Sequence, residues 1–248
     1  MATTYEDKTV VITGGTSGIG LTTAERLLDA GARVLVTGRS KDALDAARER
    51  LGGRAVVLQS DVAAAADREV LAERVKGEFG SLDLLFANAG VTRHAPFEQV
   101  TEEQFDETFA TNTKGLYFTV QKLVPLIPEG GSVVLTTSVA NVMGLPMTGV
   151  YSASKAAVRS MARTLAAELL PRGIRVNAVS PGPIDTGILQ RSQPPEVAEK
   201  MLAGYRESVP MKRLGREEEI ARAVVFLAFG ATFTTGTELA VDGGGSQL

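Results

Sequence analysis

A tyrosine and a lysine lie four residues apart in the segment YSASK, residues 151–155. Residues i and i+4 share one face of a helix, so Tyr151 and Lys155 can line the same cleft. A free tyrosine has a pKa of about 10. An ammonium at about 4 Å favours the phenolate by roughly 4 kcal/mol at an effective dielectric of about 20. The pair therefore predicts a tyrosine that exchanges a proton near neutral pH.

Two other segments supply polar groups that could meet this pair. Ser138 ends a predicted strand thirteen residues before Tyr151, where the same cleft should open. The segment TGGTSGIG, residues 13–20, follows the first predicted strand and leads directly into a helix. Glycines let the backbone approach a ligand closely, and the helix N-terminus offers free N–H groups to a phosphate. Taken alone, Tyr151 and Lys155 would be read as part of a solvated helix surface. The glycines of residues 13–20, taken alone, would be read as a tight turn that binds no ligand.

Composition excludes several classes of protein. The 248 residues carry a net charge of −3, which argues against binding to nucleic acid through phosphate contacts. No apolar run approaches the roughly 18 residues that span a membrane, and the acidic N-terminal segment is unlike a signal peptide, so we expect a cytoplasmic protein. The chain has no cysteine, and His94 is its only histidine. Thiolate and poly-histidine metal sites are therefore excluded, and we predict no metal.

Short apolar segments alternate with helical segments along the whole chain. Most are continuously apolar, as in strands covered on both faces. The predicted strands are 9–13, 33–38, 55–60, 82–87, 132–137, 174–180 and 238–243. This alternation predicts an α/β fold, a single doubly wound, Rossmann-type parallel sheet of about seven strands flanked by helices. We expect one domain, 1–248, interrupted only by an irregular substrate loop at about 186–215.

Several motifs, in this order and spacing, resemble the classical short-chain dehydrogenase/reductase family from end to end of the chain. The glycine spacing G-x-x-x-G-x-G is typical of that family rather than of the commonest dinucleotide fingerprint. The motifs are TGGTSGIG (13–20), DV (61–62), NAG (88–90), Asn112, Ser138, YSASK (151–155), PGPIDT (181–186) and VDGG (241–244).

The resemblance implies hydride transfer between a nicotinamide and a carbonyl or secondary alcohol. It makes Tyr151 the general acid/base, with Ser138 stabilising the substrate oxygen. Lys155 would lower the pKa of Tyr151 and bind the nicotinamide ribose. Asn112 would interrupt its helix and hold a water that connects Lys155 to solvent.

The resemblance also implies the residues that bind the cofactor. Besides Tyr151 and Lys155, they are Gly14, Thr16, Ser17, Gly18, Ile19, Gly20, Thr37, Arg39, Asp61, Val62, Asn88, Ala89, Gly90, Pro181, Gly182, Ile184 and Thr186. NAD-binding relatives place an aspartate at the end of the second strand, where this chain has the neutral Thr37. Arg39 follows and could grip a 2′-phosphate through two N–H bonds, so we predict NADP(H). If Arg39 only stacks on adenine, either cofactor would serve.

The composition argues against two other catalytic activities. Ser138 as an acyl-transfer nucleophile would need His94 as its base, and His94 has no identifiable acid partner. No pair among the 29 acidic residues stands out for carboxylate hydrolysis. Some relatives are non-catalytic dinucleotide-binding sensors or scaffolds, but those typically lose the tyrosine or the lysine.

The substrate is the least determined feature of the sequence. Apolar residues point to an apolar-leaning pocket for a ketone, sugar, steroid-like or secondary-alcohol substrate: Leu145, Met147, Ile188, Leu189, Met201, Leu202 and Met211. A 3-oxoacyl-[acyl-carrier-protein] reductase is the alternative. Such a reductase binds an acidic carrier protein and needs a basic docking patch. Arg172 would suit such a patch, whereas Glu129 carries the wrong charge for it. Apolar faces on the segments 101–126 and 149–171 predict a homotetramer, as is common in the family.

Overall fold

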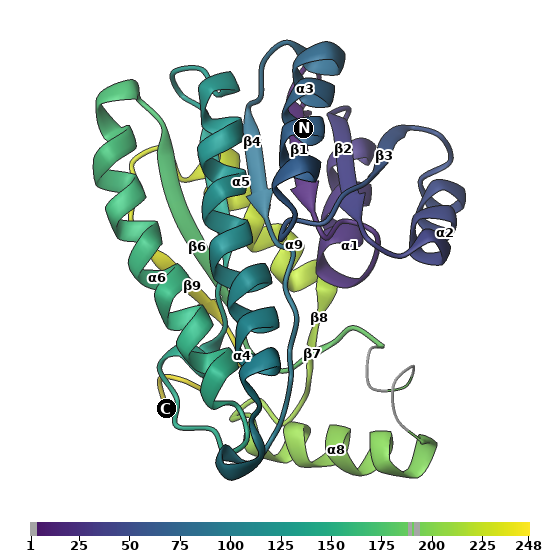
Figure 1. Ribbon diagram of the computed structural model, residues 1–248, viewed down its shortest axis with the longest axis vertical. Coiled ribbons are helices and arrows are strands. Elements are labelled where there is room, and N and C mark those ends of the chain that lie inside the picture. Colours follow the sequence, from purple (N-terminus) through teal and green to yellow (C-terminus); the bar gives the residue numbers. More distant parts are fainter. Residues whose placement is uncertain (1–3, 188–189, 191–193) are drawn as a thin grey trace.

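The computed structural model describes residues 4–187, 190 and 194–248. Seven parallel strands form the central sheet, in the order β3-β2-β1-β4-β5-β6-β9 (Figure 1). They are β1 (Thr9–Thr13), β2 (Arg33–Gly38), β3 (Ala55–Gln59), β4 (Leu84–Ala87), β5 (Ser132–Thr136), β6 (Arg175–Pro181) and β9 (Glu238–Val241). The predicted fold class is therefore confirmed, and each predicted strand lies within two residues of its observed ends.

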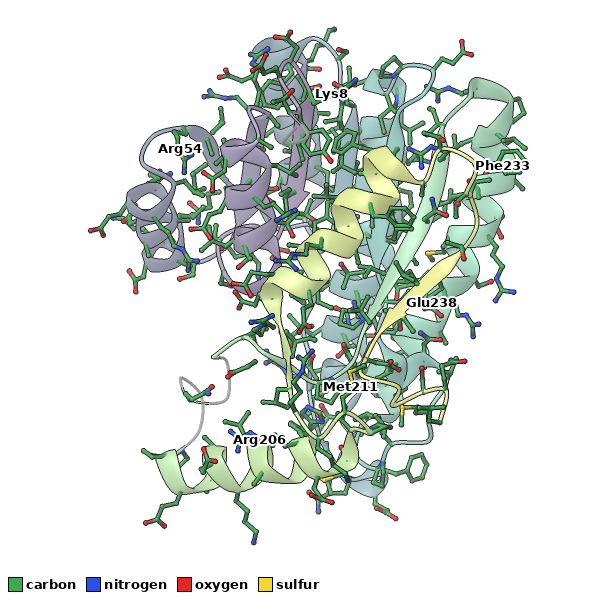
Figure 2. The ribbon with its side chains drawn as sticks, turned by 180° about the vertical axis from the view of Figure 1, so that it is seen from behind. Lys8, Arg54, Arg206, Met211, Phe233 and Glu238 are labelled. Atoms are coloured by element: carbon green, nitrogen blue, oxygen red, sulfur yellow. The ribbon has the colours of Figure 1, made fainter. Side chains whose placement is uncertain are left out.

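Helices cover both faces of the sheet. They are α1 (Gly18–Asp29), α2 (Lys41–Leu51), α3 (Ala65–Phe79), α4 (Glu102–Phe109), α5 (Leu116–Leu123), α6 (Gly149–Leu169) and α9 (Glu217–Val225). The helix α8 (Pro195–Ser208) lies outside these two layers. Because successive side chains of a strand point to opposite faces, one strand supplies two cores. Val11 packs with the helices α3, α5 and α6, whereas Val10 packs with α1, α2 and α9. Figure 2 shows α9 in front of the sheet on the second face.

The topology gathers the loops of the site at one edge of the sheet. All seven strands are parallel, so their carboxyl ends lie together. The sheet order changes direction at β1, since β2 lies on one side of β1 and β4 on the other. In doubly wound sheets the crevice at such a switch point is the usual ligand site.

The substrate loop contains a helix where the segment PEVAEKMLAGYRE, residues 195–207, indicates one, and two short strands besides. Within the described residues it contains the two-residue strand β7 (Ile184–Asp185), the 14-residue helix α8 and the strand β8 (Gly215–Arg216). β7 pairs with β8 in a small separate parallel sheet. Figure 1 shows α8 apart from the two helical layers, at the same end of the molecule as β7 and β8. The predicted pocket residues Ile188 and Leu189 lie outside the described residues.

Candidate active site

A cavity of about 670 Å³ opens at the carboxyl ends of β1 to β4. Its wall contains most of the residues predicted to bind a cofactor: Gly14, Thr16, Ser17, Gly18, Ile19, Arg39, Asp61, Val62, Asn88, Ala89, Gly90 and Thr186. Gly38, between the predicted residues Thr37 and Arg39, also lines it. Four further residues line it that the sequence motifs did not identify: Ser40, Ala43, Ser60 and Thr111. Three of these four adjoin predicted residues, and Ala43 lies four residues after Arg39, so nearness in sequence was the available signal.

The glycine loop divides its glycines between the ligand cavity and the protein interior. Gly18 lines the cavity and starts α1 with a φ of 56°, a left-handed value that favours glycine. Gly20 does not line the cavity. A Cβ at Gly20 would lie 2.3 Å from the Gly14 carbonyl oxygen, so a side chain there would push α1 away from the loop. Gly20 therefore positions the binding loop rather than touching the cavity.

Thr37 is buried in the core, with 1% of its surface exposed, and does not line the cavity. The neighbouring Gly38 lines it instead. A Cβ at Gly38 would lie 2.5 Å from Thr16 Oγ1, so this position has no room for a side chain while Thr16 keeps its place. The end of β2 thus meets the cavity one residue later than we predicted.

Asn88 connects the cavity wall to the residues around Lys155. Its Nδ2 donates to the carbonyl oxygens of Thr13 and Gly14, at 3.2 and 3.1 Å. Its Oδ1 accepts from Thr136 Oγ1 at 3.1 Å. The carbonyl oxygen of Thr136 in turn accepts from Lys155 Nζ at 2.9 Å. One short chain of hydrogen bonds therefore joins the glycine loop to the lysine.

Tyr151 lies near the start of α6, and its hydroxyl is hydrogen-bonded to the side chains of Ser138 and Thr92. Ser138 follows β5 by two residues and N-caps a short 3₁₀ turn, accepting from the Ala140 N–H at 3.3 Å. Burial raises the pKa of Tyr151, and the two hydrogen bonds oppose this only in part. The tyrosine is thus a proton donor at neutral pH. Thr92 was not predicted, because nothing in its local sequence marks it.

Lys155 is buried one turn after Tyr151, with its Nζ 5.8 Å from the centre of the Tyr151 ring. Burial lowers the pKa of Lys155 to about 8. The ammonium is therefore less basic than the argument from spacing assumed. Lys155 is not among the groups that shift the Tyr151 pKa, burial raises that pKa, and the expected lowering is absent.

Asn112 lies in a π-helical turn, Ala110–Gly115, between α4 and α5. The predicted interruption of the helix is thus present. The fully buried side chain exchanges two hydrogen bonds with the Val91 backbone, at 2.8 and 2.9 Å, and donates to Ser154 Oγ at 3.0 Å. A Cβ at Gly90 would lie 3.2 Å from Asn112 Oδ1 and 3.4 Å from Lys155 Nζ. Both polar groups therefore lie beside a residue of the cavity wall.

The motif PGPIDT follows β6. Pro181 is the last residue of that strand, and the Gly182 N–H donates to the Val241 carbonyl oxygen at 3.1 Å. A Cβ at Gly182 would lie 2.7 Å from Asp242 Cα, so the backbones of the two segments are in close contact. Ile184 lies in β7. Of this motif only Thr186 reaches the wall of the cavity.

A carboxylate far away in the sequence supports the Ser138 turn. Asn141 Nδ2 donates to the Ser138 carbonyl oxygen at 2.5 Å and to Glu238 Oε1 at 2.8 Å. Glu238 Oε2 lies 3.0 Å from Nε of Arg159 on α6. Glu238 starts β9, as Figure 2 shows. It therefore ties the turn that carries Ser138 to the helix that carries Tyr151.

Two negative findings hold for the described part of the chain. No group of three or more histidine, cysteine, aspartate or glutamate residues is arranged to hold a metal ion there. No helix within the same residues is long and apolar enough to cross a membrane.

The comparisons with known proteins agree with this geometry. Residues 14–246 match the family model described as enoyl-(acyl carrier protein) reductase. Oxidoreductase asL5 of Sarocladium schorii is 42% identical, over 97% of this chain and 96% of its own. Glucose 1-dehydrogenase of Gluconobacter oxydans is 38% identical, over 97% and 92%. The crystal structure of levodione reductase superposes with a TM-score of 0.91 at 32% identity, covering 98% of both chains.

A doubly wound sheet with a cavity at its switch point is a Rossmann-type architecture. The chain belongs to the short-chain dehydrogenase/reductase family, as its sequence motifs predicted. Members of this family bind a nicotinamide dinucleotide and act on alcohol or carbonyl groups of small molecules.

Proposed function

We propose that the protein is an NADP(H)-dependent oxidoreductase that transfers hydride between the nicotinamide and a carbonyl or secondary alcohol. The observation that carries the proposal is the Tyr151 hydroxyl, hydrogen-bonded to Ser138, on the same helix as Lys155, whose Nζ lies beside Gly90 of the cavity wall. A sensor or scaffold has no need of this half-buried proton donor. The arrangement therefore favours an active enzyme.

In the proposed reaction each of the predicted catalytic side chains has its own role. A nicotinamide bound in the cavity would supply or accept the hydride. The Tyr151 hydroxyl donates its proton to the carbonyl oxygen in reduction and takes it back in oxidation. Ser138 donates a hydrogen bond to the same oxygen and stabilises its developing charge. Lys155 binds the nicotinamide ribose, and its pKa of about 8 keeps it mainly protonated at neutral pH. We assign the water-holding role in proton relay to Asn112.

The residues of the cavity suit a dinucleotide. The first turn of α1 starts at the wall, and its N-cap Ser17 makes no side-chain bond to the free N–H groups that a phosphate could use. The start of α2 borders the same cavity through Ser40 and Ala43, next to Arg39. A helix N-terminus beside a guanidinium favours an additional phosphate. This supports NADP(H) over NAD(H), with Gly38 in place of the aspartate that would repel a 2′-phosphate.

The substrate is proposed only by class, as a small ketone, sugar or secondary alcohol. Levodione reductase and glucose 1-dehydrogenase, by their names, fall within this range. A 3-oxoacyl-[acyl-carrier-protein] reductase remains the alternative, and the description of the matching family model favours it. Against it, Arg172 Nη2 donates to the Val124 carbonyl oxygen at 2.9 Å, and Arg172 precedes β6 at the edge of the sheet opposite the cavity. It is therefore not a docking cation beside this cavity.

The test of the reaction is Tyr151→Phe, which removes only the transferable proton. We expect kcat to fall by at least about 10³-fold on a panel of ketones and sugars, with the Kd of NADPH changed less than about twofold. If the variant kept more than about a tenth of kcat, Tyr151 would lower the activation free energy by less than ~1.4 kcal/mol. That result would contradict its role as general acid/base. Tyr5→Phe is the matched control, because it removes the same hydroxyl from a ring that stacks on Phe229 and does not line the cavity.

The test of the cofactor is Arg39→Ala, with kcat/KM measured for NADPH and for NADH on one substrate. We expect the wild type to prefer NADPH and the variant to lose at least about tenfold with NADPH, since a charged hydrogen bond contributes ~1.5–3 kcal/mol. Activity with NADH should change little. Equal losses with both cofactors would mean that Arg39 only stacks on adenine.

A further inference from the structure

Arg39, the residue assigned above to the 2′-phosphate, already has an anionic partner in the cavity wall. Its Nη1 lies 3.7 Å from Asp61 Oδ2, and both residues line the 670 Å³ cavity. The two side chains are 50% and 35% exposed, so a ligand in the cavity can reach the pair. Within the described residues, Asp61 is the carboxylate with which Arg39 forms an ion pair.

Asp61 is the fixed member of the pair. Its Oδ1 accepts from the Ala63 N–H at 2.9 Å, and its own N–H donates to Asp67 Oδ2 at 2.7 Å. These bonds hold the carboxylate at the end of β3 whether or not Arg39 is near. Arg39 is anchored through its backbone, where its carbonyl oxygen accepts from Gln59 Nε2 at 3.1 Å. Its guanidinium is therefore the part that can turn.

We propose that Asp61 competes with the 2′-phosphate of the cofactor for Arg39 and so limits the preference for NADP(H). The inference rests on the proposed function, in which Arg39 binds that phosphate. A phosphate that engages Arg39 must share the guanidinium with a carboxylate that cannot withdraw, and so loses part of the attraction that Arg39 alone would give. A cofactor without the phosphate leaves the ion pair intact. Asp61 thus weakens the binding of NADPH more than that of NADH.

Asp61 also lines the cavity in which the adenine of either cofactor would lie. Any contact with adenine is common to both cofactors, so its loss cancels in the ratio of their dissociation constants. Competition for Arg39 does not cancel. The ratio Kd(NADH)/Kd(NADPH) therefore isolates the proposed effect from a general contribution to binding.

The experiment is titration of NADPH and NADH, followed by their fluorescence, into the wild type, Asp61→Asn, Arg39→Ala and the double variant. Asparagine keeps an oxygen that can accept from the Ala63 N–H, so the turn is retained, and circular dichroism checks the fold. We expect Asp61→Asn to raise the ratio about three- to fivefold at low salt, the size of an exposed ion pair. The rise should shrink at 1 M salt, where charges are screened beyond about 3 Å.

The double variant shows whether the effect passes through Arg39. In the Arg39→Ala background, Asp61→Asn should leave the ratio unchanged, because no guanidinium remains to be released. Asp45→Asn, which removes a carboxylate paired with Arg48 outside the cavity, controls for the change in net charge and should leave the ratio unchanged.

The outcomes separate this inference from the proposed cofactor. An unchanged ratio in Asp61→Asn overturns it, even if the wild type prefers NADPH through Arg39. An equal rise with and without Arg39 also overturns it, since Asp61 would then repel the phosphate directly. A wild type that binds both cofactors equally, and is indifferent to Arg39→Ala, would remove the NADP(H) assignment and this inference together.

Discussion

At the scale of single residues, the notable feature is a buried lysine. Lys155 is buried, and its Nζ donates to a backbone carbonyl oxygen. Burial lowers its pKa from 10.5 to about 8, so the folded protein holds this proton less tightly than the unfolded chain does. The lysine that the proposed chemistry needs is thus placed at a cost to stability at neutral pH.

This cost predicts a dependence of stability on pH. Between pH 8 and pH 10.5 the unfolded chain keeps the Lys155 proton while the folded protein releases it, so wild-type stability rises with pH in this window. The difference between the two pKa values corresponds to about 3 kcal/mol in the free energy of unfolding. Lys155→Met lacks this contribution. Relative to the variant, we expect the wild type to gain about 3 kcal/mol in the free energy of urea unfolding from pH 7 to pH 10.5. Parallel pH dependences would contradict the prediction.

At the scale of elements, the site depends on how β5, α6 and β9 are held together. Ser138 follows β5, Tyr151 lies on α6, and Glu238 at the start of β9 connects their supports through Asn141 and Arg159. The Glu238 side chain is only 13% exposed. Loss of this link would let the Ser138 turn move relative to Tyr151.

Glu238→Leu removes both bonds of the carboxylate, and we expect kcat to fall about tenfold or more, because small displacements of catalytic groups are costly. The Kd of NADPH should stay within about twofold, since the link lies outside the cofactor cavity. Glu238→Gln is the matched control, because its amide oxygen can still accept from Asn141 and should restore most of the activity. A loss of the same size in both variants would show that the charge, not the position, matters.

The elements themselves were largely predictable. Continuous apolar segments such as 9–13 marked buried parallel strands, and the turn motifs marked the edge of the sheet where the cavity lies. The ends of the second strand were predicted correctly, but the cavity is lined by Gly38 and not by Thr37, because the side chain of Thr37 is buried in the core. Thr92 and Glu238 were missed because their contacts join segments far apart in the chain. The opposite shift in the Tyr151 pKa was missed because spacing says nothing of burial.

At the scale of the whole molecule, apolar surface remains that one chain does not cover. Phe105 on α4 and Phe118 on α5 are 46% and 37% exposed. A groove of about 340 Å³ on α5 and α6 is lined by residues including Tyr117, Met161 and Leu165. Exposed patches of this kind mark interfaces. This surface supports the proposed homotetramer. A cytoplasmic location stays a prediction.

Light scattering tests the assembly. We expect a mass near four times the 26.1 kDa of the chain at micromolar concentration, and dissociation of that assembly in Phe118→Glu, which would bury a charge in the interface. Lys76→Glu, a change within α3 on a residue that is already polar and exposed, should leave the mass unchanged. A wild-type mass of 26.1 kDa would remove the prediction.

The hydrogen bond from Lys155 to Thr136 has a consequence for how this protein can evolve. Its acceptor is the carbonyl oxygen of the main chain, which every amino acid supplies. Substitutions at position 136 can therefore change the hydroxyl that reaches Asn88 without removing the acceptor of the lysine. Substitutions at position 136 would therefore reveal the contact with Asn88 but not the contact with Lys155. The hydrogen-bond acceptor of Lys155 is therefore kept as long as the strand β5 is kept, whichever side chain occupies position 136.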